Sequence, residues 1–377
     1  MRFALVGPGY PFRGGIAQYT TALYKSLQEQ GHEPLLISFR RQYPAFLFPG
    51  KTQHDSSRDG FISPAQALLD PLYPPSWIQA AERLIAHQPA AVIFQWWQPL
   101  FGPAYSSVIG RLKDRSNAAI IFLCHNVYPH ERLRVPGLSL LERKLIGSAF
   151  KKAEAFLVHS EKMSIQVRKF NSKAPIRRIY HPVYAFYSQW DSPQERTDRT
   201  PSILFFGNIR KYKGLAVLLE AMALVRQSMD VRLTVAGEFY VDAAPYKRMA
   251  KDLKISDRID WRDRYIANEE VPVLFRQSDL VVLPYLSATQ SGVVPLAYHF
   301  DVPVITSDVG GLSEVVLDGR TGYLFPPGQA GPLAERILRF FREEKGPEFQ
   351  EQIRCFKKDL SWQQVTDKIL GLVGSEL

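Results

Sequence analysis

Short apolar runs alternate along the chain with longer segments in which apolar residues recur every three or four positions. The runs have the length of buried strands, and the longer segments have the spacing of amphipathic helices. A succession of strand, helix and strand is typical of parallel sheets whose faces are covered by helices. The pattern therefore predicts an α/β protein built on parallel sheets.

In the first half of the chain the alternation begins with a strand over residues 3–6 and a helix over residues 16–30. The further strands predicted there cover residues 32–39, 91–96, 119–124 and 155–158. The further helices predicted there cover residues 75–87, 105–115 and 138–152. Residues 40–75, rich in proline and aromatic side chains, receive no assignment.

A second alternation follows the polar stretch 188–202, which has the composition of a linker. Its predicted strands cover residues 203–206, 231–237, 280–283 and 303–306, and its predicted helices cover residues 215–227 and 245–254. A length of 377 residues also exceeds one ordinary core. We therefore expect two Rossmann-like, doubly wound domains facing a cleft, over residues 1–187 and 203–360. The helix in residues 361–377 is expected to pack back on the first domain.

The most informative stretch runs from Asp279 to Gly328. An apolar run stops at Pro284, a loop of small residues follows, and a helical segment begins after Gly292. Ligands of parallel sheets bind at the carboxyl ends of strands, and a loop that enters a helix offers free backbone N–H groups to a phosphate. No carboxylate occurs between Asp279 and Asp301. The candidate phosphate-binding residues are Thr289, Gln290, Ser291, Gly292 and Val293.

A basic turn follows the first strand predicted in the second half. The strand ends at Gly207, and Arg210, Lys211 and Lys213 precede Gly214 and a helix. Cations beside the end of a strand and the start of a helix suit a pyrophosphate. A solvated basic turn is the alternative. Residues 289–293 favour a phosphate site over a solvated turn, because loops at the same edge of a sheet converge on one crevice.

The first half of the chain offers weaker signals. Gly14 and Gly15 precede a helix, but they do not form the G-x-G-x-x-G fingerprint, which makes a nicotinamide-dependent enzyme a poor fit. His125 follows a predicted strand directly, so we expect it at the strand end, facing the cleft. His130 and Glu131 follow on the same loop.

Two tryptophans and two cysteines in the chain are also candidates for a function. Trp96 and Trp97 could form a stacking surface for a sugar ring, but burial in the core is the favoured reading. Cys124 lies in an apolar run and is expected to be a buried strand residue. Cys124 and Cys355 lie far apart and show no metal-ligand spacing, which favours a reducing, intracellular compartment.

Positive charge is concentrated in the first half. Residues 1–185 contain 23 Lys and Arg against 11 Asp and Glu, a balance of +12, whereas the remainder contains 24 against 26, a balance of −2. Nucleic acid, an anionic membrane surface and a phosphorylated acceptor would all be attracted to such a region, and solvated helix faces would also explain it. No apolar run reaches the length of a membrane span, so a soluble or peripheral protein is expected.

Several segments together resemble the retaining, nucleotide-sugar-dependent glycosyltransferases of family 4, which have the two-domain GT-B fold. They are GGIAQYTTALYKSLQEQGHEP, the dipeptide HN at residues 125–126, GNIRKYKG, LTVAGE, SDLVVLPY, PVITSDVGGLSEVVLDGRTGYLFPPG and LSWQQVTDKIL. The resemblance covers nearly the whole chain.

The resemblance implies roles for individual residues. Arg210 and Lys213 match the pair of cations that bind the donor diphosphate, although the family's Arg usually stands where Asn208 stands here. His125 resembles the family's active-site His near the donor sugar. The donor-binding positions that it implies are Gly14, Gly15, Gly207 and residues 289–293.

The chain departs from the family at its pair of glutamates eight positions apart. Their places are taken by Ala288 and Leu296. In the family the first glutamate usually holds the donor sugar and the second holds the ribose diol. These contacts must be absent here or replaced by groups such as Thr289, Gln290 and the backbone of residues 291–293.

The resemblance implies electrostatic catalysis without a protein nucleophile: cations and backbone amides stabilise the leaving diphosphate, and the acceptor attacks from the same face. We expect a glycosyltransferase that uses no metal and no cofactor and acts on a lipid-linked or polysaccharide acceptor. It would be cytoplasmic, with peripheral binding to the inner membrane face through the basic first domain and the helix at residues 138–152.

Three alternatives stay open. A sugar-nucleotide epimerase of the same fold would need acid and base carboxylates that the sequence does not locate. A non-catalytic binding subunit would have kept the nucleotide pocket and lost the glutamates. A nucleic-acid-binding protein is suggested by charge alone, without a recognisable module.

Overall fold

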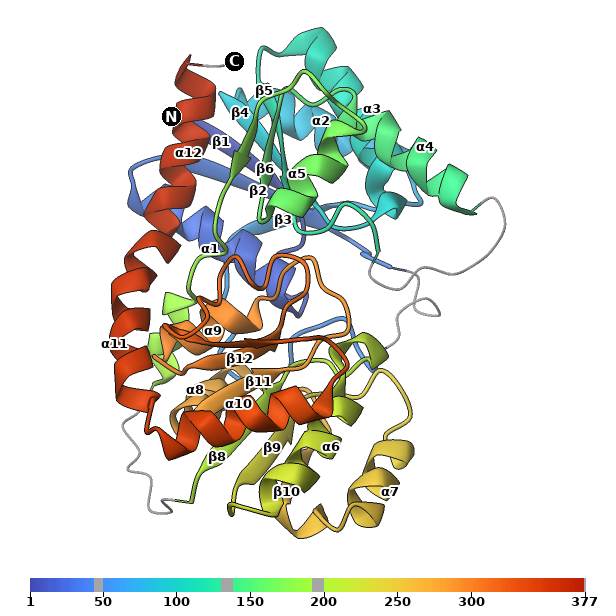
Figure 1. Cartoon of the computed structure of the whole chain (residues 1–377). Coiled ribbons are helices and arrows are strands. Elements are labelled where there is room, and N and C mark those ends of the chain that lie inside the picture. Colours follow the sequence, from blue (N-terminus) through green and yellow to red (C-terminus); the bar gives the residue numbers. More distant parts are fainter. Residues whose placement is uncertain (44–49, 130–137, 192–199, 376–377) are drawn as a thin grey trace. The chain divides into compact units, whose positions relative to one another are not determined.

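The computed structural model describes residues 1–43, 50–129, 138–191 and 200–375, and the chain divides into two compact units (Figure 1). Unit 1 comprises Met1–Asp55, Gly60–Tyr180 and Trp362–Leu377, and unit 2 comprises Ser56–Asp59 and His181–Ser361. The main division therefore falls ahead of the linker predicted at residues 188–202. Residues 192–199 of that stretch lie outside the described part of the chain.

Unit 1 is built on a sheet of seven parallel strands in the order β3-β2-β1-β4-β5-β6-β7. The strands are β1 Arg2–Val6, β2 Glu33–Phe39, β3 Ala65–Leu69, β4 Ala91–Trp96, β5 Ala119–Cys124, β6 Ala155–Val158 and β7 Ile176–Arg178. The sequence missed β3 and β7, the two edge strands. β3 contains no β-branched residue, and β7 is short and exposes Arg177 and Arg178, so neither shows the apolar pattern of a buried strand.

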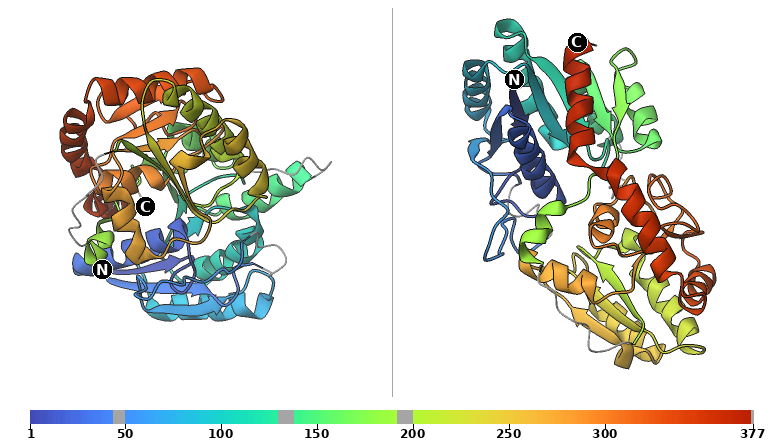
Figure 2. Two further views of the ribbon diagram at one scale, coloured as in Figure 1. Left: turned by 90° about the horizontal axis from the view of Figure 1, so that it is seen from below. Right: turned by 90° about the vertical axis from the view of Figure 1, so that its left-hand side faces the viewer.

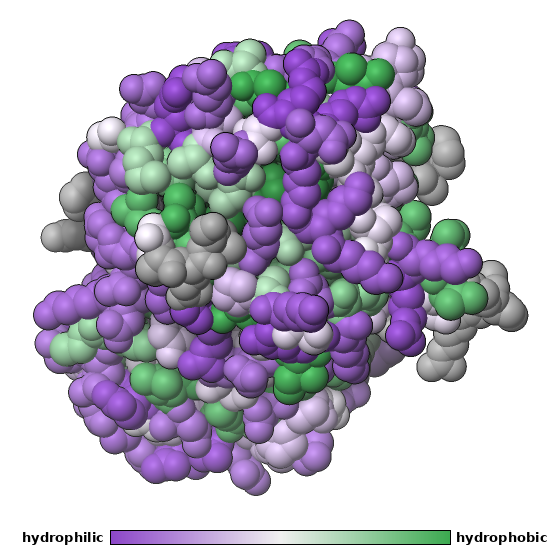
Figure 3. Space-filling model, turned by 90° about the horizontal axis from the view of Figure 1, so that it is seen from above, coloured by the Kyte–Doolittle hydropathy of each residue, from purple (hydrophilic) through white to green (hydrophobic). Residues whose placement is uncertain are grey.

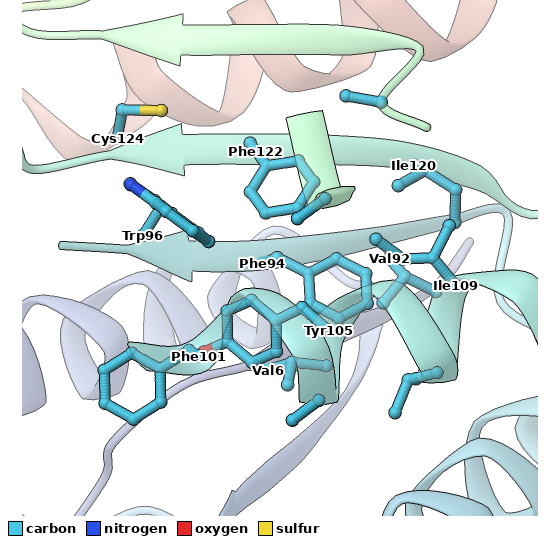
Figure 4. Packing of buried hydrophobic residues seen from close by; sticks show 14 of the residues in the cluster. Val6, Val92, Phe94, Trp96, Phe101, Tyr105, Ile109, Ile120, Phe122 and Cys124 are labelled. Atoms are coloured by element: carbon cyan, nitrogen blue, oxygen red, sulfur yellow. The ribbon is translucent and has the colours of Figure 1, made fainter. Parts of the chain in front are cut away.

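Helices cover both faces of this sheet because successive strand residues point to opposite sides. The helices of unit 1 are α1 Gly15–Glu29, α2 Pro74–His87, α3 Gly102–Arg115, α4 Leu138–Phe150, α5 Glu161–Arg168 and α12 Trp362–Ser375. On one face, Phe94 and Phe122 pack with Tyr105 of α3 (Figure 4). On the other face, α12 lies alongside α1 (Figure 2), in the unit where the sequence placed the last helix.

Unit 2 is built on a sheet of six parallel strands in the order β10-β9-β8-β11-β12-β13. The strands are β8 Ser202–Phe206, β9 Arg232–Ala236, β10 Ile259–Arg262, β11 Leu280–Leu283, β12 Val304–Ser307 and β13 Gly322–Phe325. The helices are α6 Leu215–Arg226, α7 Ala244–Asp252, α8 Val271–Arg276, α9 Val293–His299, α10 Ala330–Arg342 and α11 Gly346–Phe356. The edge strands β10 and β13 were missed by the sequence, and both are only four residues long.

The order of the strands fixes where a ligand of unit 2 can bind. β8 lies at the centre, with β9 on one side and β11 on the other, so the winding of the chain reverses between β8 and β11. In open α/β sheets ligands bind at the carboxyl ends of the strands at such a reversal. The loops that leave β8 and β11 are the two phosphate-binding segments that the sequence predicts. In the described parts of the chain, no helix is both long enough and apolar enough to cross a bilayer.

Candidate functional site

The loops that follow β8 and β11 are joined by direct contacts. The Leu286 N–H donates a hydrogen bond to the Tyr212 carbonyl oxygen over 2.7 Å. Gly214 has a φ of 70°, and a Cβ at this position would overlap the Pro284 carbonyl oxygen. Only glycine combines that backbone conformation with so close an approach. The two loops therefore form one site in unit 2.

A second glycine shapes the floor of the site. Gly207, the first residue after β8, has a φ of 97°. A Cβ on it would lie 3.0 Å from the Lys213 Nζ and 3.8 Å from a methyl carbon of Val293. Gly207 therefore brings Lys213, from the β8 loop, and Val293, from the start of α9, to one point.

Lys213 is the most unusual residue of the site. Its side chain is only 7% exposed, and its ammonium lies 5.6 Å from the centre of the Tyr285 ring. Throughout the described ranges of the chain, no ion pair or hydrogen bond neutralises this ammonium. Burial, and secondly the charge of Arg210, lower the pKa of Lys213 to about 7. A buried ammonium that forms no ion pair with the described residues would be stabilised by an anion.

Arg210 supplies the second cation. It is partly buried, and its guanidinium carbon lies 4.8 Å from the centre of the Tyr240 ring. The Lys213 N–H donates to the Arg210 carbonyl oxygen over 3.0 Å, which closes the single turn of 3-10 helix, Lys211–Lys213, that carries the cations. Lys211 in the same turn is exposed. The turn thus holds one buried and one partly buried cation beside Gly207.

The loop before α9 and the first turn of that helix differ in exposure from residue to residue. Residues 289–293 are all partly exposed, whereas Ala288 and Leu296 are 6% and 5% exposed. The Ser291 hydroxyl accepts the Val293 N–H over 3.2 Å and lies 3.4 Å from the Tyr285 hydroxyl. The Gln290 side-chain oxygen is buried and accepts no hydrogen bond from the described residues.

The loop is also fixed from a side that the sequence did not reveal. A Cβ on Gly292 would lie 2.8 Å from the Tyr184 hydroxyl and 3.7 Å from Nε2 of His181. Tyr184 and His181 are 3% and 6% exposed, and the hydroxyl lies 3.2 Å from that nitrogen. Nothing in the local pattern around residues 181–184 indicates a role at a loop more than a hundred residues away.

The candidate residues of unit 1 lie at the carboxyl ends of its strands. Gly14, with a φ of 101°, caps α1, and Gly15 is the first residue of that helix. No atom of the described residues would lie within 4 Å of a Cβ on Gly14, so the positive φ of the backbone is the observed reason for glycine there.

His125 follows β5 and is buried in a cluster of rings. It is 2% exposed, and its Nε2 lies 2.7 Å from the Gln95 side-chain oxygen. The Tyr19 ring meets it edge to face at 4.9 Å, and the His159 ring lies 5.5 Å away. The strand end predicted for His125 is correct, whereas this packing was not predicted. His130 and Glu131 lie outside the described residues.

Two family models match the chain, one for each half. A model described as Glycosyltransferase Family 4 matches residues 13–185, and one described as Glycosyl transferases group 1 matches residues 200–343. The first covers most of the leading part of unit 1, and the second covers the sheet of unit 2 and the loops that follow β8 and β11. The chain belongs to the family 4 type of glycosyltransferases.

Curated relatives of this glycosyltransferase include two from bacteria. One is a D-inositol 3-phosphate glycosyltransferase of Pseudarthrobacter chlorophenolicus, 34% identical over 137 residues, which are 35% of this chain and 32% of the relative. Another is an alpha-D-kanosaminyltransferase of Streptomyces kanamyceticus, 25% identical over 218 residues, which are 54% of this chain and 55% of the relative. The matches thus span about a third to a half of the relatives' length.

Solved structures similar to this glycosyltransferase establish its fold. A sucrose-phosphate synthase from Thermosynechococcus elongatus superposes with a TM-score of 0.72 at 20% identity, over 98% of each chain. Anabaena HepE in complex with UDP superposes with a TM-score of 0.74 at 14% identity, over 100% of each chain. The predicted family and fold class, two Rossmann-like α/β domains of the GT-B type, are confirmed.

Other features of this glycosyltransferase are structural. Trp96 and Trp97 are 0% and 6% exposed, and their indole N–H groups donate to the Val127 carbonyl and the Tyr43 hydroxyl. The favoured reading of both as core residues is therefore confirmed, and a stacking surface for a sugar is ruled out. Cys124 is a buried strand residue, as predicted.

A separate cavity in unit 2 is not the candidate phosphate site. It has a volume of about 540 Å³ and is lined by the first residues of three strands, Ser202, Arg232 and Ile259, by further residues of β9 and β10, and by residues in and just after α8. Gly207 and Lys213 belong to the opposite, carboxyl ends of the parallel strands. In the ranges that the structure describes, no group of three His, Cys, Asp or Glu side chains is placed to hold a metal ion.

Proposed function

We propose that this glycosyltransferase takes a sugar from a nucleoside-diphosphate sugar and transfers it, with retention of the anomeric configuration, to a lipid-linked or polysaccharide acceptor. The observation that carries the proposal is the buried, unneutralised ammonium of Lys213 beside Arg210, at the reversal point of the sheet. A diphosphate placed there would supply a countercharge to Lys213, whose ammonium forms no ion pair with any described residue.

The proposed reaction needs only the groups of this site. The bond between the anomeric carbon and the diphosphate oxygen breaks, and the electron pair stays on the diphosphate. The acceptor hydroxyl oxygen forms the new bond to the anomeric carbon, and its proton passes to the departing diphosphate. Lys213 and Arg210 stabilise the charge that develops on the leaving group, which is electrostatic catalysis without a protein nucleophile, metal or cofactor. Attack from the face that the diphosphate leaves gives retention.

The nature of the donor can be tested by binding. UDP and UDP-glucose are bound in solved structures of Anabaena HepE, which shares the fold, so they are the first probes to try. A ligand at 100 times its dissociation constant stabilises the folded protein by about 2.7 kcal/mol, which is a large shift in melting temperature. We expect uridine or guanosine diphosphate to stabilise the wild type and not Arg210→Ala. Lys211→Ala, which alters an exposed lysine of the same turn, is the matched control.

The positions Ala288 and Leu296 favour one competing function, a binding subunit that retains the nucleotide pocket without catalysis. Both side chains are apolar and buried, so neither position offers a donor sugar a carboxylate. Release of nucleoside diphosphate from sugar nucleotides separates the two functions. A wild type that binds nucleoside diphosphates but releases none, with water or with glycan acceptors, would support the binding subunit and contradict the transferase.

Binding to the cytoplasmic face of an anionic membrane is the second part of the proposal. The first turns of α4 expose Leu140 and Leu141, which are 59% and 50% accessible, next to exposed Arg143 and Lys144. Exposed leucines beside cations suit the boundary between lipid headgroups and acyl chains. The face shown in Figure 3 is mainly hydrophilic, with several hydrophobic areas.

Sedimentation with vesicles tests this part. We expect the protein to sediment with vesicles of phosphatidylglycerol and phosphatidylcholine at low salt, and the variant with Leu140→Ser and Leu141→Ser to stay in solution. Leu224→Ser is the matched control, because Leu224 is also exposed, at 42%, but lies on α6 in unit 2. Absence of wild-type binding to these vesicles would refute the membrane part and leave the transferase proposal intact.

A further inference from the structure

Residues His181 and Tyr184 form a buried pair at the point where the chain enters unit 2. The Val183 N–H between them donates to the Leu360 carbonyl oxygen over 2.9 Å, so the pair is tied to the last residues of unit 2. The two rings are 5.2 Å apart. The pair has no part in the proposed reaction, yet it touches the loop at which the donor diphosphate would bind.

The hydrogen bonding of the pair is determined by its surroundings. Nδ1 of His181 lies 3.1 Å from the Pro182 carbonyl oxygen, which can only accept, so this nitrogen carries the proton. Nε2 is then the acceptor for the Tyr184 hydroxyl. Burial lowers the pKa of His181 to about 4, with an opposing effect of the Pro182 carbonyl, and burial raises the pKa of Tyr184. Both groups are neutral at pH 7, and the hydroxyl has one fixed direction.

The Tyr184 hydroxyl lies directly against Gly292. The backbone of Gly292, with φ of −66° and ψ of −12°, is one that any residue adopts. The obstacle to a larger residue is therefore the hydroxyl, which would be 2.8 Å from a Cβ. Gly292 is followed by Val293, and a Cβ on Gly207 would lie 3.8 Å from a methyl carbon of Val293 and 3.0 Å from the Lys213 Nζ. The space beside Gly207 is therefore bordered by the cation and by the residue that follows Gly292.

Resting on the proposed function, we propose that Tyr184, held by His181, is a positioning residue of the diphosphate site. Its hydroxyl supports the backbone at Gly292 and Val293, which keeps the entry to α9 at a fixed distance from Gly207 and Lys213. The neighbouring Ser291 hydroxyl lies 3.4 Å from the Tyr285 hydroxyl. The loop therefore approaches two tyrosine hydroxyls, and Tyr184 touches no reacting atom.

The test compares two tyrosines of one segment. Tyr184→Phe removes the hydroxyl beside Gly292, whereas Tyr187→Phe removes an equally buried hydroxyl that donates to the Asn268 side-chain oxygen over 3.3 Å. We expect both variants to lose similar thermal stability, because each loses one buried hydrogen bond. Only Tyr184→Phe should bind uridine or guanosine diphosphate more weakly, by about fivefold or more. Equal affinities in the two variants would overturn the proposal.

A second pair of variants tests the contact with Gly292. Gly292→Ala should weaken diphosphate binding by about tenfold or more, because its Cβ meets the Tyr184 hydroxyl. Adding Tyr184→Phe to Gly292→Ala removes that overlap, so the double variant should bind better than Gly292→Ala alone. A double variant that binds no better would contradict the role of the hydroxyl. If the wild type itself binds neither diphosphate, the proposed function fails first, and that outcome is distinct from the other two.

Discussion

Replacing Lys213 by methionine should make the free protein more stable and abolish its binding of nucleoside diphosphates. Methionine keeps the length of the apolar stem and removes the ammonium. The stem is buried against Tyr285, where a neutral thioether fits well. An active-site residue that destabilises the free protein is expected if the site is built for an anion that is absent.

The size of the effect follows from the proton affinity of the lysine. In an unfolded chain its pKa has the ordinary value of 10.5, and in the folded protein it is about 7. Each unit of difference corresponds to about 1.4 kcal/mol, so burying this lysine costs about 4 kcal/mol at pH 7. Between pH 7 and pH 10.5 the unfolded chain binds more protons than the folded protein, so the stability of the wild type rises with pH. At pH 9 the cost has fallen to about 2 kcal/mol.

Urea unfolding at pH 7 and pH 9 measures both quantities. We expect the unfolding free energy of Lys213→Met to exceed that of the wild type by several kcal/mol at pH 7. At pH 9 this difference should be smaller by about 2 kcal/mol. Lys211→Met, which removes an exposed ammonium two residues away, should change the unfolding free energy by less than about 0.5 kcal/mol. A stability difference that is absent, or that does not narrow as the pH rises, would refute the assignment of Lys213 as a buried, unneutralised cation.

Three further predictions concern protons and backbone. Calorimetry in buffers of different ionisation enthalpy should show that binding of uridine or guanosine diphosphate at pH 8 takes up roughly one proton, because the diphosphate restores the charge of Lys213; binding without proton uptake contradicts this coupling. Gly214→Ala should lower the unfolding free energy by more than about 3 kcal/mol and abolish diphosphate binding. The control is Gly319→Ala, at a φ of 72° and with no described atom within 4 Å of its Cβ, which should cost only about 1 kcal/mol of backbone strain. Equal losses of unfolding free energy in the two variants would show that the Pro284 carbonyl is no obstacle. Because the pKa of His181 is lowered to about 4 in the folded protein, the unfolded chain binds a proton first as the pH falls. The unfolding free energy of the wild type should therefore decrease by about 2 kcal/mol between pH 7 and pH 5 through this residue, and that of His181→Asn should decrease correspondingly less. Parallel profiles of unfolding free energy against pH for the two proteins would contradict this prediction.

The hydrophobic pattern was sufficient to predict most of the fold. Central strands such as β5 and β11 are continuous apolar runs, because both of their faces are covered, and the sequence located them to within one or two residues. The edge strands β3 and β7 are partly exposed, so their sequences lack the continuous apolar run of a central strand. For these two strands, partial exposure explains why the hydrophobic pattern did not predict them.

The candidate site was predictable where it depends on strand ends. The loop after β8 contains Gly207 and Lys213, and the loop after β11 leads to Val293. Because β8 and β11 are neighbours in the sheet, these residues come together. The sequence around Lys213 could not predict that its side chain is buried, because the residues that surround it belong to both loops. It also could not show the contact of Tyr184 with Gly292, because that contact joins segments without any shared motif.

Burial, and secondly the charge of Arg210, lower the pKa of Lys213, and the missing glutamates leave this shift without an opposing carboxylate from the loop before α9. A carboxylate near an ammonium favours its charged form, and the stretch between Asp279 and Asp301, which faces Lys213 across the site, contains none. Among the residues that the structure describes, the Tyr285 ring alone lies over the ammonium, so in the free protein the lysine gives up its proton near neutrality. In the proposed complex the diphosphate must supply the entire countercharge. Donor binding is then linked to protonation of Lys213, so diphosphate affinity should decrease as the pH rises above 7.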